Sequence, residues 1–155
     1  MIFQNDPQMW EKVRKYGCNF RSLLAIAEFY CDQELTADDI KDAYAAMVGK
    51  AMDADCTMNA QLSLVTRWAF NRLGHPYQAL QVGIVYPPAK FEFWKSARVY
   101  TILKGLMHPT GYDGRSYPTF HFRLGDRMGK VIFDPYDPSP KIISEDCVLL
   151  YQVVG

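Results

Sequence analysis

The segment that decides the fold is FHFRLGDRMGKVIFDP, at positions 120–135 of the 155-residue chain. Apolar and polar residues alternate on both sides of a central GDRMG sequence, which is typical of two antiparallel strands joined by a turn. The register that we predict places Phe122 opposite Phe133. It also pairs Leu124 with Val131, so that the hairpin has one continuous apolar face, which a shift by one residue would destroy.

The same register sets Gly125 against Lys130 and places His121 opposite Asp134, on the other face of the hairpin. Directly opposed residues of antiparallel strands have Cβ atoms about 4.5–5.5 Å apart. A carboxylate at that distance can hold an imidazole in one tautomer and one orientation, as a catalytic histidine requires. The alternative interpretation is an exposed His–Asp pair without a catalytic role.

A candidate nucleophile lies near the other end of the chain. Cys18 directly follows Gly17 and precedes FRSLLAIAEFY at 20–30, where apolar residues recur with the period of a helix. Backbone N–H groups and the positive end of the dipole at a helix start favour the thiolate over the thiol. We expect Gly17 to let the backbone approach a substrate closely. The alternative for Cys18 is a buried, inert cysteine.

The order of predicted elements indicates the fold class. The first half of the sequence predicts helices. One covers 40–52 and follows an N-cap signature in which Thr36 is followed by Asp39. Another covers 58–73 and stops before Gly74. Strands are predicted in the second half at 77–85, 98–106, 120–124, 130–133 and 148–154. We therefore expect an α+β fold in one domain, 1–155, with N-terminal helices packed on a C-terminal antiparallel sheet.

Composition restricts the classes of function. Lys plus Arg equals Asp plus Glu at 17 each, so nothing favours a nucleic acid or an anionic membrane as partner. The N-terminus lacks a secretory signal and no apolar stretch could span a bilayer, so we expect a cytoplasmic location. The cysteines show no metal-ligand spacing, so we expect reduced thiols and neither metal nor cofactor. They stand at Cys18, Cys31, Cys56 and Cys147, and the last three are expected to pack in the core.

The other candidates for a site are weaker. His75 and His108 each precede a proline, where turn formation explains them. The Pro- and aromatic-rich segments 86–96, which contains Trp94, and 108–118 are expected to be loops that shape a cleft.

Together these features resemble the papain-like cysteine peptidase superfamily, most closely the small bacterial branch that resembles bacteriocin-leader-processing (double-glycine) peptidases. The matching motifs are Tyr16-Gly17-Cys18…Ser22-Leu23-Leu24 and His121-Phe122…Ile132-Phe133-Asp134-Pro135. The resemblance implies a papain-like fold whose sheet forms a half-barrel, with Cys18 as nucleophile, His121 as base and Asp134 as the group that orients the base. It also implies a peptide or protein substrate.

The chain departs from the family pattern at one position. The family usually has a glutamine about six residues before the nucleophile, where it donates to the oxyanion, but 11–14 of this chain is Glu-Lys-Val-Arg. The candidates for a replacement donor beside the Cys18 N–H group are Gln8, Gln4, Asn19 and Lys12.

These observations lead to three hypotheses. The first is a cysteine hydrolase, most simply a peptidase, acting through a thioester acyl-enzyme. The second is a phage-type cell-wall amidase or endopeptidase with the same Cys–His chemistry. The third is a catalytically inactive papain-like domain that binds a peptide or a protein, which the missing glutamine would favour.

Overall fold

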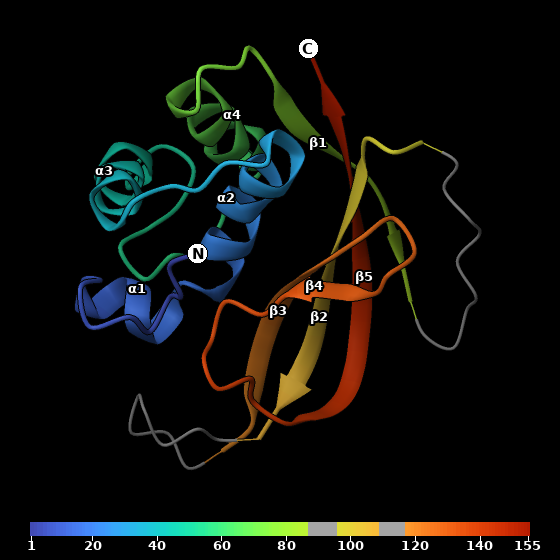
Figure 1. Ribbon diagram of the computed structural model, residues 1–155. Helices are drawn as coiled ribbons and strands as arrows, with labels where there is room; N and C mark the ends of the chain where they lie inside the picture. Colours follow the sequence, from blue (N-terminus) through green and yellow to red (C-terminus); the bar gives the residue numbers. More distant parts are fainter. Residues whose placement is uncertain (87–95, 109–116) are drawn as a thin grey trace.

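The computed structural model describes residues 1–86, 96–108 and 117–155 (Figure 1). Most of the two loops predicted to shape the cleft, with Trp94, therefore lies outside the described residues. The elements are α1 (Glu11–Tyr16), α2 (Cys18–Cys31), α3 (Ala37–Met47), α4 (Leu62–Arg72), β1 (Gln78–Val85), β2 (Val99–Met107), β3 (Thr119–Gly125), β4 (Val131–Phe133) and β5 (Ile142–Val154).

The strands form one five-stranded sheet in the order β1-β5-β2-β3-β4, and every neighbouring pair is antiparallel. Figure 1 shows the helices gathered on one side of this sheet. Helix α2 packs against β3 and β2, α4 packs against β1, and α3 packs on α4. The predicted α+β class, with N-terminal helices on a C-terminal antiparallel sheet, is confirmed.

Helix α2 is the centre of the core. Nine consecutive residues from Phe20 to Glu28 are buried, because α2 packs against α4 as well as against β2 and β3. The helix ends at Asp32, which takes the left-handed conformation with φ 51°. Within the described part of the chain, no helix has the length and apolarity needed to cross a membrane.

A buried ion pair on α2 holds the N-terminal segment. Arg21 and Glu28 are almost completely buried, and their side chains meet at 2.6 Å. Arg21 also donates to the Ile2 carbonyl at 2.7 Å and lies over the Phe133 ring, 4.9 Å from its centre. Glu28 accepts the Leu35 N–H at 2.8 Å. Both charges thus have hydrogen-bond partners that offset the cost of removing them from water.

Two predicted helices are shorter in the structure than the sequence suggested. The Thr36 cap is confirmed, because its side chain accepts the Asp39 N–H while the Asp39 carboxylate accepts the Thr36 N–H. The helix nevertheless ends at Met47, before the turn around Gly49, which has φ 82°. Helix α4 begins at Leu62 rather than at position 58, while α1 was not predicted.

The predicted register of the β3–β4 hairpin is wrong. The Asp126 carboxylate accepts the N–H groups of Met128 and Lys130, which closes the turn after Gly125 rather than at it. Gly125 is consequently paired with Val131 instead of Lys130.

The change of register also alters the apolar pairs. A bulge follows, and Phe133 lies opposite Leu124 rather than opposite Phe122. Leu124 and Phe133 are both buried, whereas Val131 is exposed. The apolar pattern correctly predicted a hairpin, but it does not indicate how many residues form the turn.

We expect Thr36→Ala to lower the free energy of unfolding by about 1 kcal/mol, because it removes the oxygen that caps α3. Urea denaturation followed by circular dichroism measures this change. A stability equal to that of the wild type would show that the cap contributes nothing.

Candidate active site

Cys18 is the first residue of α2 and is half-buried. Gly17 joins α1 to α2, and its N–H donates to the Val13 carbonyl at 2.8 Å. A Cβ atom at Gly17 would lie 2.4 Å from that carbonyl oxygen. Glycine is therefore required here by the close approach of α1, whereas the sequence had suggested approach of a substrate. The tight junction places the Cys18 thiol at the positive end of α2.

His121 lies on β3 and is 1% exposed. Its Nε2 is 2.7 Å from Asp134 Oδ1, so the two residues that the sequence paired are in contact. Asp134 comes directly after β4 rather than on it, and the same Oδ1 accepts the Tyr136 N–H at 3.0 Å. This turn fixes the carboxylate, which in turn fixes the imidazole and leaves Nδ1 as its second ring nitrogen.

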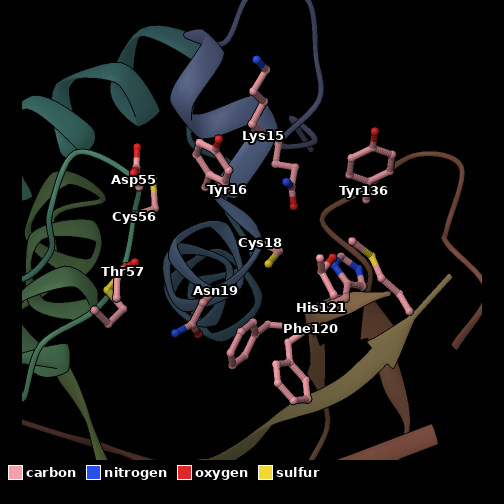
Figure 2. A pocket seen from close by; sticks show the side chains of 15 residues that line it. Lys15, Tyr16, Cys18, Asn19, Asp55, Cys56, Thr57, Phe120, His121 and Tyr136 are labelled. Atoms are coloured by element: carbon pink, nitrogen blue, oxygen red, sulfur yellow. The ribbon is translucent and has the colours of Figure 1, made fainter. Parts of the chain in front are cut away.

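A contact between α2 and β3 brings the cysteine and the histidine together. Ser22, one helical turn after Cys18, is fully buried and donates to the Phe122 carbonyl at 3.2 Å. Phe122 is the next residue after His121, so this bond joins the helix to the strand beside both candidate residues. Figure 2 shows the Cys18 sulfur and the His121 ring facing each other across the pocket.

The environment of His121 favours the charged imidazolium. Burial opposes the charge, but hydrogen bonds to Asp134 and to Cys18 outweigh it and raise the pKa of His121 from 6.5 to about 9. The ring is therefore protonated at neutral pH, directly beside the Cys18 sulfur. A thiol next to an imidazolium is the arrangement that activates cysteine as a nucleophile.

The two residues open into a cavity of about 350 Å³ (Figure 2). Three parts of the chain enclose it: the N-terminal segment with the α1–α2 junction, the loop 55–58, and the ends of β2 and β3 with the turn after β4. The lining residues are Gln4, Lys15, Tyr16, Cys18, Asn19, Asp55, Cys56, Thr57, Met58, Met107, Thr119, Phe120, His121, Phe122 and Tyr136.

The candidates for an oxyanion donor differ in position. Neither Gln8, which is exposed, nor Lys12 lines the cavity, and the Lys12 ammonium is paired at 2.6 Å with Asp55, which does line it. Asn19 lines the cavity, but Figure 2 shows its amide directed away from the Cys18 sulfur. The structure thus does not bring Gln8 to the site, because the turn that contains it faces solvent.

Gln4 is the candidate donor that is buried at the cavity. It is 2% exposed and lines the same cavity as Cys18 and His121. Its amide nitrogen, which carries two hydrogens, donates to the Arg14 carbonyl at 3.1 Å, and its Oε1 is buried with no hydrogen-bond partner among the described residues. The family spacing would not have found Gln4, because α1 lies between this glutamine and the nucleophile.

The remaining cysteines and histidines have other surroundings. Cys56 lines the cavity, which the sequence did not indicate, and burial raises its pKa to about 12, so that it stays a thiol. Cys147 is buried and Cys31 is half-buried. His75 stacks on Tyr77, and His108 does not line the cavity.

Comparison of the chain with protein-family models, with curated proteins and with solved structures finds no match. The interpretation of the site therefore depends on its geometry and chemistry.

We expect the His121 imidazole to titrate near pH 9 in NMR spectra, and Asp134→Asn to lower the midpoint because it removes the carboxylate that favours the charged ring. The folded chain holds this proton more tightly than the unfolded chain. The resulting stabilisation is complete below about pH 6.5 and is lost as the pH rises through 9. A midpoint near 6.5 in both proteins would contradict this assignment.

Proposed function

We propose that the chain is a papain-like cysteine hydrolase that cleaves peptide or isopeptide bonds. The observation that carries this proposal is the Cys18 sulfur at the start of α2 facing a buried imidazole that Asp134 holds at 2.7 Å. A helix start that presents the nucleophile, against an antiparallel sheet that presents the base, supports a papain-like arrangement in which the sheet acts as the half-barrel.

The first half of the reaction forms a thioester. The Cys18 thiolate attacks the carbonyl carbon, and the electrons of the carbonyl double bond move to its oxygen. When the tetrahedral intermediate collapses, the C–N bond breaks and the amine leaves with a proton from His121 Nδ1. Asp134 holds the ring through Nε2 during this transfer and stabilises its charged form.

The second half releases the acid. The neutral His121 takes a proton from water, and the resulting hydroxide attacks the thioester carbonyl. The C–S bond breaks, so that the thiolate and the imidazolium are restored together. Burial of His121 limits competing proton exchange with solvent, because the ring is 1% exposed.

Gln4 is the proposed side-chain donor to the oxyanion, together with the Cys18 backbone N–H. Its burial fixes the amide, and its bond to Arg14 sets the amide orientation. A donor that is already oriented stabilises charge in the transition state without a cost of reorganisation. In this proposal Gln4 replaces the glutamine that the family pattern places closer to the nucleophile.

The cavity has an apolar part that suits the side chains of a peptide substrate. It is formed by Met58, Met107, Phe120 and Phe122. Purified murein and a peptide library separate the two hydrolase classes: loss of murein turbidity without peptide cleavage would favour the cell-wall amidase.

We expect iodoacetamide to alkylate Cys18 rapidly at pH 6, because a thiolate beside an imidazolium reacts where ordinary thiols do not. Mass spectrometry of the labelled peptides locates the site. His121→Ala should slow labelling of Cys18 to the rate of an ordinary thiol. Cys31 is the internal control, since burial raises its pKa. Equal, slow labelling of Cys18 and Cys31 would favour the inactive, peptide-binding domain.

We expect Gln4→Ala to lower acylation of Cys18 by an activated ester, p-nitrophenyl acetate, by about 10²–10³-fold, because a transition-state donor is lost. The burst of p-nitrophenolate measures this rate. Alkylation of Cys18 should be unchanged, since it develops no oxyanion. Acylation at the wild-type rate would exclude Gln4 as the donor.

A further inference from the structure

The N-terminal segment is paired with the turn that follows β4. The Gln4 N–H donates to the Pro135 carbonyl at 2.7 Å. Beside it, the Asn5 side-chain nitrogen donates to the Asp137 carbonyl at 2.7 Å, while the Asn5 side-chain oxygen accepts the Asp137 N–H at 3.0 Å. Three hydrogen bonds therefore hold two segments that lie more than 130 residues apart along the chain.

Both partners in this pairing carry a residue of the proposed active site. Gln4 stands on the N-terminal segment, and Asp134 begins the turn. Tyr136, two residues after Asp134 on the same turn, lines the cavity and meets the His121 ring edge-on with ring centres 6.5 Å apart. A shift of either segment would thus move the oxyanion donor relative to the imidazole.

We propose that Asn5 is a positioning residue for the oxyanion donor. Asn5 does not line the cavity, so it acts through Gln4, whose amide it fixes relative to Cys18. The inference rests on the proposed function, because a donor needs positioning only where an oxyanion forms. Misplacement of a reacting group by about 1 Å can reduce a rate by about 10²-fold.

The chemistry of asparagine suits this role. An amide can donate to a carbonyl and accept from an N–H at the same time, and Asn5 makes both bonds to one residue. Aspartate at this position would keep the acceptor but would set a carboxylate oxygen against the Asp137 carbonyl. Both bonds are exposed to solvent, so their loss should affect the position of the segment more than the global stability.

The experiment compares Asn5→Ala and Asn5→Asp with the wild type in two reactions of Cys18. Acylation by p-nitrophenyl acetate develops an oxyanion, whereas alkylation by iodoacetamide does not. We expect Asn5→Ala to lower the acylation rate about 10- to 100-fold with alkylation unchanged. Asn5→Asp, which retains one bond but sets a carboxylate oxygen against the Asp137 carbonyl, should also acylate more slowly than the wild type, with alkylation unchanged.

Two controls make the result specific. Thr36→Ala removes a cap on α3 at a helix outside the cavity lining, and it should leave both rates at the wild-type value. If Asn5 acts through Gln4, the double variant Gln4→Ala/Asn5→Ala should acylate no more slowly than Gln4→Ala alone.

Several outcomes would overturn the inference. These are acylation of Asn5→Ala at the wild-type rate, a parallel loss of alkylation, or additive effects of the two substitutions. Slow alkylation of the wild type itself would instead contradict the proposed function, and the inference with it. Rapid alkylation with normal acylation in Asn5→Ala would leave the proposed function standing and reject the inference alone.

Discussion

The site depends on the contact between α2 and β3. Cys18 and His121 lie about a hundred residues apart in sequence, and neither has a local reason to meet the other. The Ser22 hydroxyl donates to the Phe122 carbonyl. Ser22 lies one helical turn after Cys18 and Phe122 is the residue after His121, so this bond fixes the helix and the strand beside both candidate residues. The apolar side of α2 supplies the driving force for this packing, and the hydrogen bond sets its position.

Burial of His121 has a cost that the neighbouring groups offset. Removing an imidazole from water disfavours its charged form, which alone would leave a neutral ring at neutral pH. The Asp134 carboxylate and the Cys18 sulfur reverse that preference. The Asp134 carboxylate is itself held in place by the Tyr136 N–H, which donates to it. The same turn is held by the N-terminal segment, which the buried Arg21 ties back to α2. Each of these groups is thus held in place by a contact with the next, from α2 through the N-terminal segment and the turn after β4 to His121.

Sequence patterns predicted the parts of this architecture that depend on local chemistry. The Thr36 cap, the apolar period of α2 and the alternation in β3 correctly indicated element types, because each is a property of neighbouring residues. The predicted hairpin register was wrong because the Asp126 carboxylate accepts N–H groups of the turn. The alternation of apolar residues carries no information about these hydrogen bonds. The His121–Asp134 contact was nonetheless found, since a carboxylate just past the strand end can still reach the imidazole.

The position of Gln4, the proposed oxyanion donor, shows why the remainder could not be predicted. Gln4 was one of several candidates, and Gln8 and Asn19 stood closer in sequence to the nucleophile. Only the path of the chain decides among them. The first residues cross over to the turn at Pro135, which buries Gln4 in the cavity, while Gln8 remains in solvent. That path depends on hydrogen bonds between the N-terminal segment and the turn after β4, which no local pattern encodes.

The central claim is that Cys18 accepts an acyl group with help from His121. The most direct test is to quench the reaction with an activated ester in acid and to locate the added acyl mass by peptide mass spectrometry. The account predicts the acyl group on the peptide that contains Cys18, and its absence in His121→Ala. An acyl group spread over surface lysines, or the same amount on Cys18 with and without the imidazole, would contradict it.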